Sequence, residues 1–206
     1  QFAAGNATTL ANDLLKPERV FGAEMGVDYV GENNRASVTF FRNRLDDLVT
    51  NVTLRVTPTA ITRQRQNAAQ ALTRGAEFEY KQRWRAWQAE FSYLFADSRF
   101  STSLRIPQIP KHQGSGQLVW TGKTTFLAAG VRSYGAQYDD DLNRFRLPGF
   151  AALHISARQQ VYRSLSAVAA FENLLDREYF VAFTPVPQNG APRLWRVGLR
   201  WDGRLF

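Results

Sequence analysis

The string TGKTT at residues 121–125 contains residue types that bind phosphate in nucleotide-hydrolysing proteins. A phosphate-binding loop of that kind also needs a glycine where this chain has Gln117, and it must lead into a helix. The residues after Thr125 alternate as in a strand, so we expect a short hairpin turn here. The string GSG at residues 114–116 is no dinucleotide fingerprint either, because Val119 occupies the position of its third glycine.

Metal-binding residue types are few and scattered. His112 and His154 are the two histidines, and the chain has no cysteine, whereas a metal needs three or four converging ligands. We therefore predict no metal site, with His112 in a loop and His154 on the polar face of a strand. Asp139, Asp140 and Asp141 form an acidic run that could hold Ca²⁺ through carboxylate oxygens, but we expect a solvated loop tip instead.

The sequence contains no residue pattern that indicates an enzyme. No Gly-x-Ser-x-Gly elbow occurs, and nothing in the spacing selects His154 with Ser156 or Ser166 as a catalytic pair. We expect the protein not to be an enzyme and to need no cofactor.

Length and composition limit the classes of protein to which this chain can belong. The chain has 206 residues, begins with Gln1 and carries a net charge of +8, which comes mostly from arginine. No apolar run is long enough for a membrane helix. The charge suggests nucleic acid, but a single-strand groove needs aromatic and basic groups on one surface. Here they alternate between faces, as Trp195 and Trp201 do with Arg196 and Arg200, so we expect no nucleic-acid partner.

The dominant sequence period is two, which indicates strands. Phe21, Met25 and Tyr29 share one face of the first such segment, while Glu24 and Asp28 share the other. About nine segments behave this way. They are residues 21–29, 35–49, 76–81, 87–95, 113–121, 125–134, 153–158, 165–171 and 195–201.

The connections alternate in length. Short turns are expected near Gly31, Gln82, Gly122 and Tyr162, and longer loops at residues 51–73, 97–112, 137–147 and 181–191. Short turns at one end and long loops at the other are typical of an up-and-down transmembrane β-barrel. A soluble β-sandwich also alternates and is the distant alternative.

The residue types on the two strand faces favour a transmembrane barrel over a soluble sandwich. Aromatic residues lie near strand ends on the apolar faces, as interfacial girdles require, and charges lie in mid-strand on the polar faces, where a wet lumen tolerates them. We expect lumen arginines to pair with carboxylates there. The arginines are Arg35, Arg158, Arg196 and Arg200, and the carboxylates are Glu24, Glu77, Glu79, Glu90 and Glu172. Nine strands do not make an even-numbered closed barrel, so we expect a part of a larger one.

Five segments, in order, carry a family resemblance. They are LKPERVFGAEMGVDY (15–29), VTFFRNRLDDLV (38–49), RGAEFEY (74–80), FENLLDREYF (171–180) and GAPRLWRVGLRW (190–201). The chain resembles the C-terminal part of a TonB-dependent outer-membrane receptor. It departs from the family at its end, because Phe206 is out of phase with the outward face of the last strand, which carries Trp195 and Trp201.

The resemblance implies an all-β, antiparallel, 22-stranded barrel in the outer membrane of a Gram-negative bacterium, closed inside by an N-terminal plug domain. Residues 1–206 would supply about nine strands and lack the plug, so by themselves they should neither bind TonB nor transport. The implied partners are the lipid bilayer, the plug, TonB through the missing N-terminal region, and a metal-chelate ligand. A ferric siderophore is the first expectation, cobalamin or haem the alternative, and a passive porin-like barrel the rival.

Ligand contacts are expected in the outer loops, because loops on a rigid scaffold supply binding residues. Arg63, Arg65, Tyr138 and Arg144 are the candidates. Their charge and hydrogen-bonding groups suit an anionic ferric chelate.

Overall fold

The protein is described by a computed structural model covering residues 2–4, 7–184 and 186–203, and in these ranges every regular element is a strand. They contain no helix long and apolar enough to cross a membrane. Phe206, whose phase differs from that of the last strand, lies outside the described residues.

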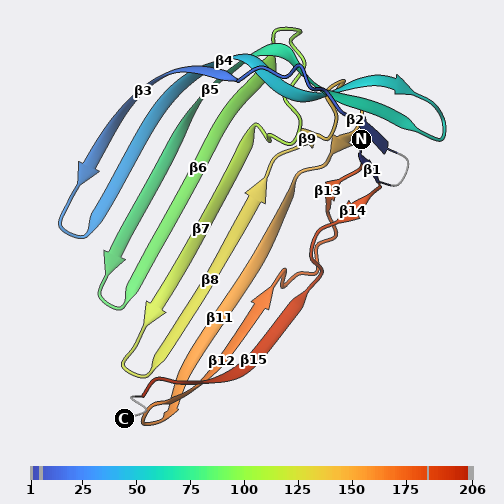
Figure 1. Ribbon diagram of the computed structural model, residues 1–206. Helices are drawn as coiled ribbons and strands as arrows, with labels where there is room; N and C mark the ends of the chain where they lie inside the picture. The colour runs from blue at the N-terminus through green and yellow to red at the C-terminus, as the bar shows by residue number, and fades with distance from the viewer. Residues whose placement is uncertain (1, 5–6, 185, 204–206) are drawn as a thin grey trace.

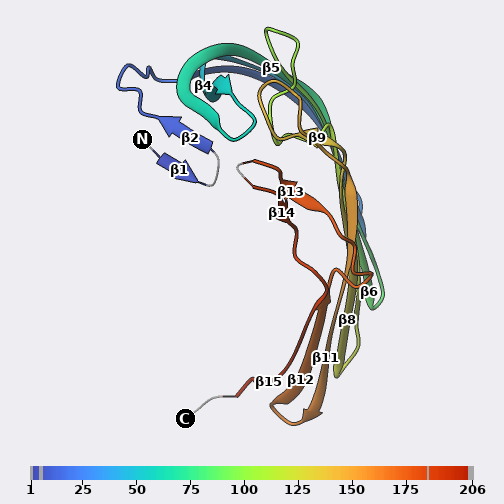
Figure 2. The same ribbon diagram turned by 90° about the vertical axis from the view of Figure 1, so that its right-hand side faces the viewer.

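Nine long strands form one wall (Figures 1 and 2). They are β3 (Arg19–Val30), β4 (Asn34–Val56), β5 (Ile61–Trp84), β6 (Trp87–Phe100), β7 (His112–Thr121), β8 (Thr125–Tyr134), β11 (Phe150–Tyr162), β12 (Leu165–Glu172) and β15 (Leu194–Trp201). Each pairs antiparallel with the next, and the wall is a single curved sheet that does not close on itself. The expected all-β architecture is confirmed, and the two facing layers of a soluble sandwich are not what these residues form.

Six short strands lie at one end of this wall. They are β1 (Phe2–Ala4), β2 (Ala7–Leu10), β9 (Gln137–Tyr138), β10 (Arg146–Leu147), β13 (Phe180–Ala182) and β14 (Gln188–Asn189). β1 and β2 extend the main sheet to eleven strands, because β2 pairs in parallel with the outer part of β5. β9 with β10 and β13 with β14 form two small hairpins, and Figure 2 shows β13 and β14 on the concave side of the wall.

The strand register collects the apolar residues on one face of the wall. Met25 lies opposite Phe40, Phe40 opposite Ala76, and Ala76 opposite Phe95. Similar rows cross the whole sheet, and their side chains remain open, with Met25 70% exposed. A wide, exposed apolar face of this kind suits lipid rather than water.

The opposite face carries the polar residues. Ser92 Oγ and Ser115 Oγ, on neighbouring strands, are 2.8 Å apart, and Lys81 Nζ is 3.3 Å from Glu90 Oε1. Arg196 pairs with Glu172 as expected, whereas Arg200 pairs with Asp202 and Arg158 lies over the Phe126 ring. The expected polar cross-linking is thus confirmed for Arg196, while these two other arginines use different partners.

The prediction of a loop over residues 51–73 is wrong for most of its length. β4 continues to Val56 and β5 begins at Ile61, with a tight turn between them in which Thr57 N donates to Ala60 O at 2.8 Å. A strand of 24 residues, as β5 is, has a contour length of about 80 Å, far more than a bilayer requires. The outer part of β5 has polar residues on both faces, such as Arg63 and Gln64, so its sequence does not alternate although the backbone pairing persists.

Other expected loops also contain strands. β6 reaches Phe100, and the segments 137–147 and 181–191 fold into the two small hairpins. His112 is the first residue of β7 rather than a loop residue, and its Nδ1 lies 2.7 Å from Tyr93 Oη. His154 lies on the polar face as predicted, directly over Gly130, which leaves room for its ring.

Two of the sequence motifs contact each other. Asn173, with a φ of 48°, donates to Arg177 O at 2.9 Å and to Ala191 O at 3.0 Å. Asp176 Oδ1 accepts a hydrogen bond from Arg193 N at 2.9 Å. The FENLLDREYF turn therefore holds the GAPR segment that leads into β15.

Candidate functional site

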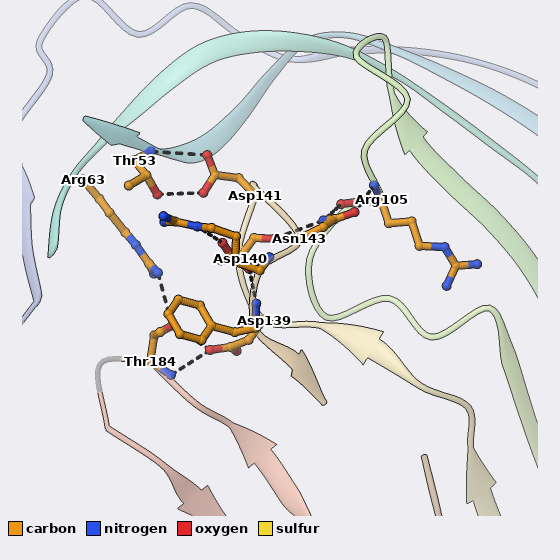
Figure 3. A network of polar contacts seen from close by, with 10 residues as sticks. Thr53, Arg63, Arg105, Asp139, Asp140, Asp141, Asn143 and Thr184 are labelled. Atoms are coloured by element: carbon orange, nitrogen blue, oxygen red, sulfur yellow. Dashed lines mark hydrogen bonds and ion pairs between the residues drawn. The ribbon is translucent and has the colours of Figure 1, made fainter. Parts of the chain in front are cut away.

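A cavity of about 410 Å³ lies where the outer part of the β4–β5 hairpin meets the loops of the wall. Figure 3 shows the polar network beside it, which joins four segments distant in sequence. Its lining comes from β2, β4, β5 and three loops: Ala7, Thr9, Leu48, Val49, Thr50, Asn51, Arg63, Ile106, Pro107, Gln108, Asp139, Asp140, Asp141 and Thr184.

Asp139 is the centre of this network. Its Oδ2 accepts hydrogen bonds from Thr184 Oγ1 at 2.6 Å, Thr184 N at 2.7 Å and Phe183 N at 3.0 Å. Its Oδ1 accepts one from Gln108 Nε2 at 2.9 Å. Burial alone would raise the pKa of this carboxyl, but the donors hold the pKa below its ordinary value of 3.8. Asp139 is therefore an ionised group that fastens the loops at Gln108 and Thr184 to its own.

Asp140 organises its own loop. The residue is 2% exposed, and its Oδ1 accepts hydrogen bonds from Arg144 N at 2.8 Å and Phe145 N at 2.9 Å. Asn143 extends the order to another loop, because its side chain makes reciprocal hydrogen bonds with Arg105 N and Arg105 O, at 2.7 and 2.9 Å. The side-chain amide of Asn143 thus pairs with the backbone of Arg105 as a neighbouring strand would.

Asp141 joins this loop to the β4–β5 hairpin. Its Oδ1 accepts from Thr53 Oγ1 at 2.8 Å and its Oδ2 from Thr53 N at 3.3 Å, across 88 residues of sequence. The three consecutive carboxylates thus take separate partners.

The expectation of a solvated acidic loop tip is therefore wrong for Asp139 and Asp140, which are both buried. In the described part of the chain, no group of three or more His, Cys, Asp or Glu residues is arranged to hold a metal ion, so the calcium alternative finds no support there.

Arg63 brings positive charge to the cavity wall. One of its terminal nitrogens donates to Thr184 Oγ1 at 3.2 Å. Its Nε is buried and has no hydrogen-bond partner among the described residues. A guanidinium nitrogen in this state can donate to an oxygen of a molecule entering the cavity.

The other three predicted ligand residues are placed differently. Tyr138 lies on β9 next to Asp139, and its backbone oxygen accepts from Gln108 N at 2.7 Å. Arg144 Nε lies 3.5 Å from Asp140 Oδ2, which engages its guanidinium. Arg65 is exposed on β5 and does not line the cavity. Arg63 and Arg65 are strand residues, so their assignment to a loop was wrong.

The hydrogen-bond partners of Asp139, Asp140 and Asp141 were not among the predicted site residues. Thr53, Gln108 and Thr184 are ordinary polar residues with no motif around them. The available signal was the string DDDLNR, because aspartate and asparagine often hydrogen-bond to nearby backbone in turns. That signal indicates local order at Asp140, but it does not reveal which distant segment each carboxylate meets.

A curved antiparallel wall, apolar on one face and polar on the other, with folded loops gathered at one end, defines a portion of a transmembrane β-barrel. The family model for the TonB-dependent receptor-like β-barrel matches residues 1–174. The chain belongs to this family, as the motifs predicted. The family consists of transporters rather than enzymes, in agreement with the expectation that the chain is no enzyme.

Solved structures show the same fold. The ferric yersiniabactin uptake receptor FyuA from Yersinia pestis is 20% identical with a TM-score of 0.77, and the match covers 91% of this chain and 30% of that one. The pyoverdine outer membrane receptor FpvA from Pseudomonas aeruginosa is 23% identical, with a TM-score of 0.74 and coverages of 94% and 31%. The copper transporter OprC is 17% identical, with a TM-score of 0.76 and coverages of 92% and 33%.

The chain thus spans about a third of the length of these receptors. No curated protein matches the sequence.

Proposed function

We propose that residues 1–206 form the C-terminal part of the barrel of an outer-membrane receptor in a Gram-negative bacterium. The whole protein imports a scarce metal chelate, and a ferric siderophore is the first choice. This chain contributes barrel wall and external loops. The observation that carries the proposal is the pairing of a lipid-suited face with an ordered loop assembly at one end only.

The loop assembly supports ligand capture. Its cavity contains Arg63, whose Nε has an unused donor, and the carboxylate network keeps that arginine in place through Thr184. We propose that Arg63, Arg65, Tyr138 and Arg144 contribute contacts to an anionic chelate. Arg63 is the strongest candidate, because Arg144 is engaged by Asp140.

The rest of the machinery belongs to the remainder of the protein. Receptors such as FyuA and FpvA are about three times as long as this chain, which leaves room for further strands and a plug domain. The proposed partners are that plug, the bilayer, and TonB acting through the plug. Ferric yersiniabactin, pyoverdine and copper are named for the solved relatives, so a metal or its chelate is the common theme.

The test is uptake by the intact protein. A strain lacking its own siderophore receptors would express it under iron limitation, and growth would be scored with a panel of ferric siderophores, haem and cobalamin. The expected result is rescue by one ligand class that disappears when tonB is deleted, with the protein recovered in the outer-membrane fraction. Rescue that persists without tonB would indicate the passive porin-like rival, and absence from the outer membrane would contradict the proposal.

A further inference from the structure

An arginine cluster lies on the apolar side of the wall, beyond the last row that is apolar on β4, β5 and β6 together. That row is formed by Phe40 on β4, Ala76 on β5 and Phe95 on β6. Two residues further along each strand, on the same face, the next row is Arg42, Arg74 and Asp97. On β3 the apolar residues continue, because Ala23 lies opposite Arg42 and Phe21 lies opposite Arg44.

The row after that contains two more arginines. Arg44 lies opposite Leu72, and Leu72 lies opposite Arg99. The outer arginine cluster consists of Arg42, Arg44, Arg74 and Arg99. They project from three adjacent strands, which Figure 1 shows side by side.

The position of the cluster is set by the length of the apolar band. On β6 the outward-facing residues Trp87, Phe91, Tyr93 and Phe95 are aromatic, and the segment 87–95 has nine residues, about the length of a strand that spans a bilayer. Tyr93 and Phe95 both contact the His112 ring at the end of this band. Such aromatic residues mark the membrane interface, so the cluster lies at the depth of the lipid headgroups.

The charges in the cluster are incompletely compensated. Arg42 and Arg74 are directly opposite each other, an arrangement of like charges that is unfavourable without an anion nearby. Among the described residues Arg42 has no ion-pair partner and no side-chain hydrogen bond, and Arg42 is exposed.

The neighbouring carboxylates are already occupied. Asp97 lies 3.2 Å from Arg99 and 3.9 Å from both Arg105 and Arg74, so three arginines share one carboxylate. Asp46 Oδ1 forms an ion pair with Arg44 Nε at 3.2 Å. Arg42 and Arg74 are therefore the two cations of the cluster with the most capacity for a further anion.

A groove is present at the same place. It has a volume of about 410 Å³, and its lining contains the four arginines, the donors Gln70, Ser101 and Ser103, and one carboxylate, that of Asp97. Arginine forks match the oxygens of a phosphate group and bind it bidentately.

We propose that the outer arginine cluster binds the phosphate of a lipid headgroup in the outer leaflet, with the acyl chains of that lipid lying against the apolar band below. This site is on the outside of the barrel and is separate from the ligand cavity. It rests on the proposed membrane location. A soluble anion would use only the arginines, whereas a lipid uses the arginines and the apolar row of Phe40 and Phe95 together.

The experiment uses the intact receptor, purified in a non-ionic detergent. Diphosphoryl lipid A and the same lipid with both phosphates removed are titrated, and bound lipid is counted by native mass spectrometry. The phosphorylated lipid should bind at least about tenfold more tightly. The double variant Arg42→Gln/Arg74→Gln should lose about tenfold of that affinity, and Arg42→Lys should lose less, because it keeps the charge.

Arg35→Gln is the matched control, since Arg35 lies on the same strand β4 but on the polar face. It should leave lipid binding unchanged. Equal affinity for the two lipids, or an unchanged double variant, would overturn the lipid site. Displacement of the lipid by inorganic phosphate at equal concentration would also overturn it, because the anion alone would then be the ligand.

Folding and membrane insertion are scored separately, by heat-modified gel migration and by outer-membrane fractionation. A receptor that inserts normally but does not prefer the phosphorylated lipid loses only this inference. A receptor that is absent from the outer membrane contradicts the proposed function, and the lipid site fails with it.

Discussion

The Asp139 carboxylate accepts both the hydroxyl and the backbone N–H of Thr184, at 2.6 and 2.7 Å, across 45 residues of sequence. This contact fastens the loop before β14 to the loop between β9 and β10. The same threonine hydroxyl accepts a hydrogen bond from Arg63. The position of the proposed ligand-binding arginine therefore depends on a carboxylate that does not itself need to touch ligand.

Asp139→Asn should loosen this loop junction. An amide offers one acceptor oxygen in place of two, and its NH₂ group would oppose the N–H donors of Phe183 and Thr184. We expect a loss of about 2 kcal/mol, which corresponds to roughly thirtyfold faster hydrogen exchange at these two amides. Asp13→Asn, at an exposed position, is the control and should change nothing. Unaltered exchange in Asp139→Asn would show that the junction does not depend on the charge.

The same junction should depend on pH. The folded-state pKa of Asp139 lies below 3.8, so its contribution to stability is complete above about pH 3.8 and is lost as the pH falls through the lower, folded value. Limited proteolysis of the loop at 181–191, using an acid-active protease, should accelerate only below that pH. In Asp139→Asn the loop should be cleaved rapidly at every pH, and a retained pH step would assign the effect to another group.

Asn173→Ala should destabilise the entry into β15. It removes the hydrogen bonds to Arg177 O, Ala191 O and Arg177 N, and it places alanine at a φ of 48°. We expect a loss of about 3 kcal/mol in the free energy of unfolding, measured by urea titration of the barrel in detergent. Asn173→Gly should recover about 1 kcal/mol of that loss, because glycine tolerates the backbone conformation. Asn189→Ala, on exposed β14, should be neutral.

An arginine introduced on the apolar face of the wall should destabilise the barrel much more than one introduced on the polar face. Val38 lies in the apolar row between Val27 and Phe78, so Val38→Arg should cost about 2–4 kcal/mol of stability in a bilayer. Ser37→Arg, one residue earlier on the polar face, should cost little. Folding yield into vesicles and urea unfolding measure both. Equal costs for the two variants would contradict the assignment of the faces.

Arg63→Gln should weaken ligand capture more than Arg65→Gln. Arg63 lines the cavity with an unpaired Nε, whereas Arg65 is exposed outside it. We expect about a tenfold loss of uptake affinity for Arg63→Gln and no more than about threefold for Arg65→Gln, measured with the chelate that rescues growth. A larger effect at Arg65 would move the binding surface to the exposed side of the hairpin.

The strands of the wall could be predicted because the alternation that defines them lies within short stretches of sequence. Phe21, Ala23, Met25, Val27 and Tyr29 place an apolar side chain at every second residue, since a strand presents one face to lipid and the other to the lumen. The register then follows from tight turns such as the one at Gly122. In the outer part of β5 consecutive residues from Thr62 to Asn67 are polar on both faces, so the period disappears there and this hairpin was mistaken for a loop.

The sequence by itself determined the strand number of the wall, its two faces and its family, because repeated alternation and ordered motifs are properties of the chain. Only the tertiary structure decided that Asp139 and Asp140 are buried, that Asp141 meets Thr53, and that Arg42 faces Arg74. These relationships join segments up to 88 residues apart. They depend on how the loops fold over the wall and on how neighbouring strands align, which no local pattern of residues specifies.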